Sequence, residues 1–122
     1  MEWTPIVDCA YDASITVGTV TESGTVTVAL KDFAGNALKN INRVTAYISS
    51  DVDGLTTSTV SSATIVTGIQ NSIEATKSYE FISETDGTFS TTLDGTGANS
   101  RYLQVCLANG KVVASPIVTF TN

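Results

Sequence analysis

Apolar and polar residues alternate along several short segments of the chain, and this period of two predicts β-strands. Over residues 25–30, Val26, Val28 and Leu30 fall on one face, while the hydroxyl-bearing residues fall on the other. The same alternation recurs over residues 43–49. Each segment therefore has one face suited to a core and one suited to solvent.

Further strands follow at intervals of about 8 to 12 residues, which is typical of a β-sandwich. Asp-Gly and Asn-Gly pairs between them favour tight turns. Pro116 has no amide hydrogen, so the last strand is expected at a sheet edge. We expect an all-β, immunoglobulin-like sandwich of about seven to nine antiparallel strands, with a closed barrel as the alternative. The other predicted strands are residues 14–20, one short strand within 55–68, and residues 78–83, 89–93, 102–107, 112–114 and 117–120.

Composition supports the same class. Only 15% of the 122 residues are charged, so the chain draws its polarity mainly from hydroxyl groups. Threonine is β-branched and suits the pleated surface of a strand. The length is that of one domain. We place the sandwich at residues 14–122 and treat residues 1–13 separately.

The N-terminal segment contains the only tryptophan, Trp3, with Pro5, Ile6 and Val7, and it has no clear alternation. Two interpretations stay open: it is a first strand of the sandwich, or it is an arm that leaves the domain and docks on a partner. In the second case these four residues are the expected partner-binding residues, because aromatic and aliphatic anchors dominate interface energies.

The net charge of −6 and six scattered basic residues argue against a nucleic-acid-binding surface, which needs clustered Lys and Arg. No apolar run is long enough to span a membrane, and the N-terminus lacks the pattern of a signal peptide. We expect a protein that is made in the cytoplasm or already processed, with neither nucleic acid nor membrane as a partner.

Cys9 and Cys106 are the only cysteines. They could join an early strand to a late one, but a chain without an export signal is normally made where thiols stay reduced. We favour free, buried thiols. The chain has no histidine and no CxxC spacing, so we expect no metal site and no cofactor.

Asp51 and Asp53 stand close together and raise the question of a calcium loop. If they held the third and fifth positions of an EF-hand, the twelfth position would be Val60, where a bidentate Glu is required. Asp-Gly pairs also separate apolar runs at residues 86–87 and 94–95. Turn chemistry explains all three places, so we interpret the acidic pair as part of a turn.

Catalytic patterns are missing from the sequence. Without histidine, a Ser or Thr nucleophile would need another base, and neither a G-x-S-x-G nor an S-x-x-K motif occurs. The acidic residues lie in predicted turns or near chain ends, apart from Glu80, which alternates outward. We expect no enzyme and assign no catalytic residues.

Several turn motifs resemble those of a family of small phage-encoded structural proteins with an immunoglobulin-like sandwich. They are DFAGN at residues 32–36, YISSDVDG at residues 47–54, the later Asp-Gly turn, and the pattern from Tyr102 to Phe120 that includes Asn-Gly-Lys. The likeness extends over residues 25–120. Ala108 stands where the family usually has proline.

The resemblance implies a virion component that has no catalytic residues. The first interpretation is a capsid decoration protein, located on the outside of a phage head and made in the host cytoplasm. Its partner would be the major capsid protein, and a closed trimer would suit a three-fold site. A tail, fibre or host-attachment domain is the alternative, which could bind carbohydrate through Tyr47 or Tyr102 over a hydroxyl-rich groove. A bacterial immunoglobulin-like surface module is a further alternative.

Overall fold

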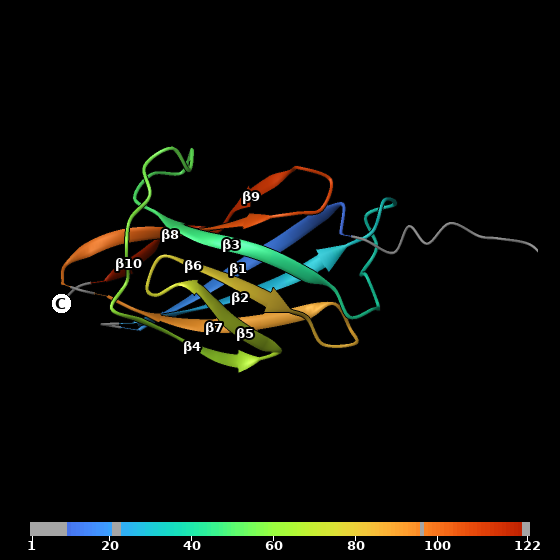
Figure 1. Ribbon diagram of the computed structural model, residues 1–122, viewed down its shortest axis with the longest axis horizontal. Helices are drawn as coiled ribbons and strands as arrows, with labels where there is room; N and C mark the ends of the chain where they lie inside the picture. The colour runs from blue at the N-terminus through green and yellow to red at the C-terminus, as the bar shows by residue number, and fades with distance from the viewer. Residues whose placement is uncertain (1–9, 21–22, 96, 121–122) are drawn as a thin grey trace, which may run out of the picture.

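Ten strands form two antiparallel sheets in the computed structural model, which describes residues 10–20, 23–95 and 97–120 (Figure 1). One sheet has the order β1-β2-β7-β4, and the other has the order β10-β8-β3-β6-β5, with β9 paired to β8. The predicted all-β sandwich is confirmed. The strands are β1 (Asp12–Val20), β2 (Ser23–Lys31), β3 (Arg43–Ser49), β4 (Ser62–Thr67), β5 (Ile69–Glu74), β6 (Ser78–Ile82), β7 (Thr88–Asp94), β8 (Asn99–Cys106), β9 (Val112–Ala114) and β10 (Val118–Phe120).

The core lies between the two sheets, on the faces that the alternation predicted. Phe89 of β7 stacks on Phe81 of β6 with ring centroids 4.7 Å apart, so one aromatic pair connects the sheets. Burying such side chains is the main force that holds a sandwich together. Other buried core residues are Val26, Val28, Leu30, Val44, Ala46, Ile48, Tyr79, Leu93, Leu103, Val105, Val118 and Phe120.

Strand β5 was not predicted, and it accounts for the difference between the expected and observed numbers of strands. The chain leaves β4 in one sheet and enters β5 in the other on either side of Gly68. The side chain of Gln70 ties the two edges, because its Nε2 donates to Ala63 O at 2.8 Å and its Oε1 accepts from Thr91 Oγ1 at 2.7 Å. Most of β5 is exposed, so its sequence has no buried alternation to reveal it.

Two ends of the sandwich can be distinguished. The near end contains Ala10, where the described chain begins, the connection 32–42, and the turns 83–87 and 107–111; it lies to the right in Figure 1. The far end, to the left, contains the loop 50–61 and the turn between β5 and β6. Since β3 runs from the near end to the far end, the loop that follows it projects away from Ala10.

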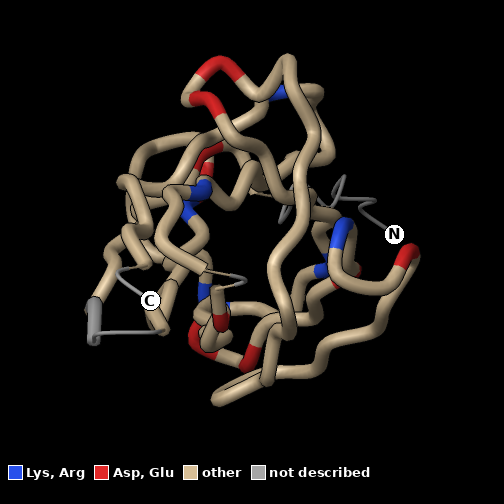
Figure 2. Tube along the Cα trace, turned by 90° about the vertical axis from the view of Figure 1, so that its left-hand side faces the viewer, with Lys and Arg blue, Asp and Glu red and all other residues tan. Residues whose placement is uncertain are grey.

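Acidic residues lie mostly in turns and at strand ends (Figure 2). Within the described chain, Glu80 is the exception: it lies inside β6, faces outward as predicted, and pairs with Arg43 at 3.4 Å. The strand faces therefore carry few acidic side chains. The negative charges are instead distributed over the turns and strand ends, which reduces the repulsion between them.

Candidate contact surfaces

Residues 50–57 form a loop that is closed by its own hydrogen bonds. Ser50 N donates to Thr56 O at 3.0 Å, and the carboxylate of Asp51 accepts from Leu55 N at 3.1 Å and from Thr56 N at 3.3 Å. A carboxylate that accepts backbone amides in this way is ordinary turn chemistry. The predicted turn is confirmed, with Asp51 as its acceptor, while Asp53 lies exposed on the loop.

Gln104 of β8 holds this loop against the outer face of the larger sheet. Its Nε2 lies 3.1 Å from Ser49 Oγ, 3.3 Å from Asp51 O and 3.1 Å from Val52 O. Ser49 Oγ in turn donates to Asp51 O at 2.7 Å. Both Gln104 and Ser49 are buried, because the loop covers them. Local alternation would leave them in solvent, so the sequence carried no signal for this cluster.

Tyr47 forms the other attachment of the loop. Its hydroxyl donates to Gly54 O at 2.8 Å, and burial raises the pKa of the phenol above its usual value. Gly54 has a φ of +74°, and a Cβ there would lie 2.5 Å from the Tyr47 hydroxyl oxygen. Glycine is required at this position for both reasons. The motif YISSDVDG therefore encodes a loop fastened to a sheet face.

The fastened loop carries exposed apolar side chains. Leu55 is 85% exposed and Val52 is 58% exposed. No Lys or Arg occurs in residues 50–61, but Arg101 of β8 reaches the loop, where its Nε donates to Thr59 O at 2.8 Å. The loop thus exposes two apolar side chains together with the carboxylate of Asp53.

Replacing Gln104 with methionine is expected to release the loop, because methionine has a similar size but donates no hydrogen bond. Losing these buried bonds should lower the free energy of unfolding by about 1–3 kcal/mol. The amides of Leu55 and Thr56 should also exchange with solvent faster. Urea denaturation and amide hydrogen exchange measure the two effects. Unchanged exchange of both amides would contradict the role of Gln104 as the loop's anchor.

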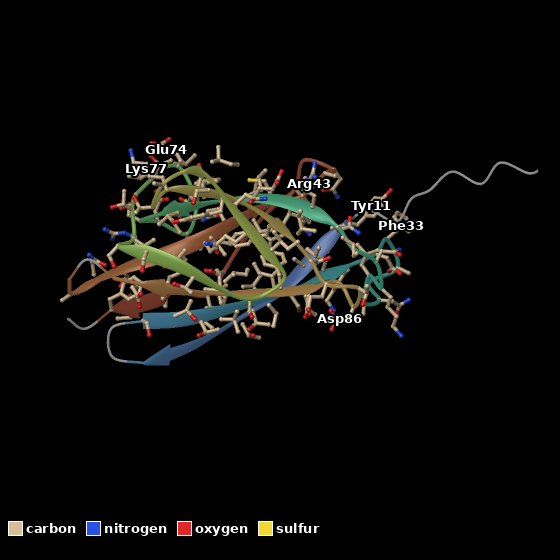
Figure 3. All side chains as sticks on the ribbon, turned by 60° about the horizontal axis from the view of Figure 1, so that its bottom comes forward. Tyr11, Phe33, Arg43, Glu74, Lys77 and Asp86 are labelled. Atoms are coloured by element: carbon tan, nitrogen blue, oxygen red, sulfur yellow. The ribbon has the colours of Figure 1, made fainter. Side chains whose placement is uncertain are left out.

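The near end is the place where the chain enters the sandwich. Tyr11 N donates to Lys31 O at 2.9 Å, and Asn109 Nδ2 donates to Tyr11 O at 3.2 Å. The ring of Tyr11 meets Phe33 edge-on at 5.3 Å, as Figure 3 illustrates, yet Phe33 remains 82% exposed. The predicted partner-binding residues Trp3, Pro5, Ile6 and Val7 lie outside the described residues.

Asp12 fastens the start of β1 at this end. Its carboxylate accepts from Ala13 N at 2.8 Å and pairs with Lys111 at 3.1 Å. The hydrogen bond from Ala13 is the main cause that lowers the pKa of Asp12 below its usual value, and Lys111 adds to it. The predicted N-terminal segment 1–13 therefore overlaps the first strand of the sandwich, since Asp12 and Ala13 belong to β1.

Hydroxyl side chains cover the outer face of the smaller sheet. Thr25 and Thr92 lie 3.0 Å apart through their hydroxyl oxygens, as do Thr67 and Ser90. The strand register places these hydroxyls on one side: Ser14, Thr16, Thr25, Thr27, Thr64, Thr67, Thr88, Ser90 and Thr92. Tyr47 and Tyr102 belong to the other sheet, and the hydroxyl group of Tyr47 is bonded beneath the loop. Neither tyrosine therefore lies over these hydroxyls, and the carbohydrate-binding alternative stays a prediction.

The two edge strands β4 and β5 each contain an irregularity in pairing. The register shifts between Ile65 and Thr67 in β4, and between Ser72 and Glu74 in β5. The residues inside these shifts, Val66 and Ile73, are both exposed. Bulges of this kind hinder the addition of another strand to an open edge.

Cys106 has a free, half-buried thiol, and burial raises its pKa above the usual value. This agrees with the prediction of a free thiol at this position, although burial is only partial. Cys9 lies outside the described residues.

Among the residues that the structure describes, no three His, Cys, Asp or Glu side chains are grouped so that they could hold a metal ion. The same residues include no helix of the length and hydropathy needed to cross a membrane.

No protein-family model matches the chain, and no curated protein is detectably similar to it in sequence.

Proposed function

We propose that this protein is a virion structural protein that binds the outer surface of a phage capsid and stabilises the assembled shell. The observation that carries the proposal is the fastened loop 50–57, which exposes Val52 and Leu55 on a rigid support. Surfaces of this kind suit protein contact, because an ordered loop loses little further entropy on binding. The turn motifs that resemble phage decoration proteins support the same assignment.

Stabilisation would come from linkage. A domain that binds only the assembled shell shifts the equilibrium toward that shell by its binding free energy. At a concentration one hundred times the dissociation constant, this contribution is about 2.7 kcal/mol for each site. A capsid presents many equivalent sites, so small contributions accumulate over the particle.

The N-terminal arm is the first contact in this proposal, and the major capsid protein is its partner. Trp3, Ile6 and Val7 would insert as apolar anchors, with Pro5 restricting the backbone between Trp3 and Ile6. The arm precedes Ala10 and Tyr11, and the ring of Tyr11 contacts the exposed ring of Phe33. A partner surface at the near end could therefore receive both.

Cosedimentation of the purified protein with undecorated capsids tests this function. The full chain should pellet with the capsids and saturate at a fixed ratio to the capsid subunits. Removing residues 1–9 should weaken binding by at least about tenfold, which corresponds to one anchor side chain of ordinary strength. The deletion must stop at residue 9, because Ala10 is buried and β1 begins at Asp12.

A matched control keeps the arm's length and changes only its anchors. The variant Trp3→Ser with Ile6→Ser should lose binding as the deletion does, whereas Thr4→Ser should bind as the unmodified chain does. If the full chain does not pellet with capsids, the proposed function is wrong. If the deletion binds with full affinity, the arm is not the contact.

A further inference from the structure

The turn between β8 and β9, at the near end of the sandwich, exposes the pair Asn109-Gly110 (Figure 1). The chain has no other Asn-Gly pair, because every other asparagine precedes a bulkier residue or ends the chain. In such a pair the glycine amide nitrogen can attack the side chain of asparagine, since glycine has no Cβ to obstruct the approach and its backbone adopts many conformations. The turn therefore contains the groups needed for a spontaneous covalent change.

We propose that Asn109 is a modification site, where spontaneous deamidation adds a negative charge and releases Tyr11 from the turn 107–111. The Gly110 nitrogen gives its proton to hydroxide and bonds to Cγ of Asn109, while the Cγ–Nδ2 bond breaks and the nitrogen leaves as ammonia with a proton from water, which restores the hydroxide. Water then opens the five-membered imide. Cleavage at Cγ gives aspartate, and cleavage at the main-chain carbonyl gives isoaspartate. The proposal is independent of capsid binding.

The side chain of Asn109 is folded back on the peptide that must react. Its Oδ1 accepts from Lys111 N at 3.0 Å, the arrangement of an Asx-turn, so the side-chain amide is held against the Gly110 backbone. Gly110 N donates to Leu107 O at 3.0 Å, and this bond must open before the nitrogen can attack. Exposed turns open locally at little cost in free energy. Asn109 should therefore react faster than an asparagine whose backbone is paired inside a strand.

Asn109 also connects the turn to the residue that precedes β1. Its Nδ2 donates to Tyr11 O at 3.2 Å, and an ionised aspartate at this position has no donor to replace it. The new carboxylate would face the carbonyl oxygen of Tyr11 and repel it. It would also lie beside Lys111, which pairs with Asp12 at 3.1 Å, so two carboxylates would compete for the same cation. Both changes weaken the attachment of the turn to the start of β1.

Incubation of the purified protein at neutral and mildly alkaline pH tests the modification. Peptide mapping by mass spectrometry should find aspartate and isoaspartate at position 109, formed faster at the higher pH because hydroxide starts the reaction. Asn71 is the internal control: it is exposed and precedes the small residue Ser72, but its backbone pairs with Glu80 of β6. The variant Asn109→Gln should gain no charge there, since glutamine would have to form a larger ring. The site is wrong if Asn109 keeps its amide over several weeks at mildly alkaline pH, or reacts no faster than Asn71.

The variant Asn109→Asp tests the release of Tyr11. The amide of Tyr11, which donates to Lys31 O at 2.9 Å, should exchange with solvent about two- to tenfold faster, the range that the loss of one hydrogen bond gives. The amide of Ile48, which donates to Lys77 O at the far end, should exchange at its unmodified rate. Unchanged exchange of Tyr11 would overturn the release. Equal acceleration at Ile48 would overturn it as well, because the whole domain rather than the start of β1 would then be loosened.

Discussion

Replacing Phe89 with alanine is expected to lower the free energy of unfolding by about 3–5 kcal/mol, a large share of the stability of a domain this size. Phe89 is 0% exposed and stacks on Phe81 with the ring planes 14° apart. Its side chain belongs to the smaller sheet and Phe81 belongs to the larger, so the truncation leaves a cavity between the sheets. Urea denaturation should show a lower midpoint with an unchanged slope.

Phe33→Ala is the matched control for this change. It removes the same atoms from a ring that is 82% exposed and touches Tyr11 edge-on. The expected loss is within about 1 kcal/mol, the upper range for an exposed aromatic contact. Equal losses in the two variants would mean that the Phe81–Phe89 stack is not the centre of the core.

Replacing Gly87 with alanine is expected to destabilise the near end of the sandwich by about 3 kcal/mol or more. Gly87 has a φ of +77°, and a methyl group there would overlap the carbonyl oxygen of Leu38. The turn cannot move away easily, because Gly87 O accepts from Leu30 N at 2.9 Å and Gly87 N donates to Glu84 O at 2.9 Å. Strain and overlap therefore act together.

Gly35→Ala separates these two causes. Gly35 has a φ of +86°, but a Cβ at this position would meet nothing within 4 Å. Only conformational strain remains, and the expected loss is about 1–2 kcal/mol. Thermal or urea unfolding of both variants measures the difference. If Gly35→Ala were as harmful as Gly87→Ala, close packing against Leu38 would not explain the requirement for glycine.

The core and the candidate contact surfaces use different residues. Phe89 and Gly87 hold the sandwich together, whereas Val52, Leu55 and Phe33 are exposed and contribute little to folding. Substitutions of Val52 or Leu55 should therefore leave the fold unchanged. Gln104 links the core to the loop 50–57, because it belongs to β8 and its side chain donates to Val52 O in the loop.

Much of the fold could be predicted because its signals are local. Alternation over β2 identified Val26 and Val28 as core residues, and both are fully buried. The Asn-Gly turn between β8 and β9 and the edge position of β10 after Pro116 are likewise confirmed. The strand β5 was missed since an exposed edge strand needs no apolar alternation, and its place beside β6 depends on the rest of the sheet.

The sequence by itself determined the strands other than β5, most of the turns and the hydroxyl-rich character of the chain with its few charges, because these depend on residues close to one another along it. Tertiary structure alone decided that Gln104 meets Ser49, 55 residues away, and that their contact fastens the loop after β3. It also gathered the hydroxyls of separate strands on one sheet face and set the loop at the end of the sandwich opposite Ala10. Such features arise from packing between distant segments, which no local pattern records.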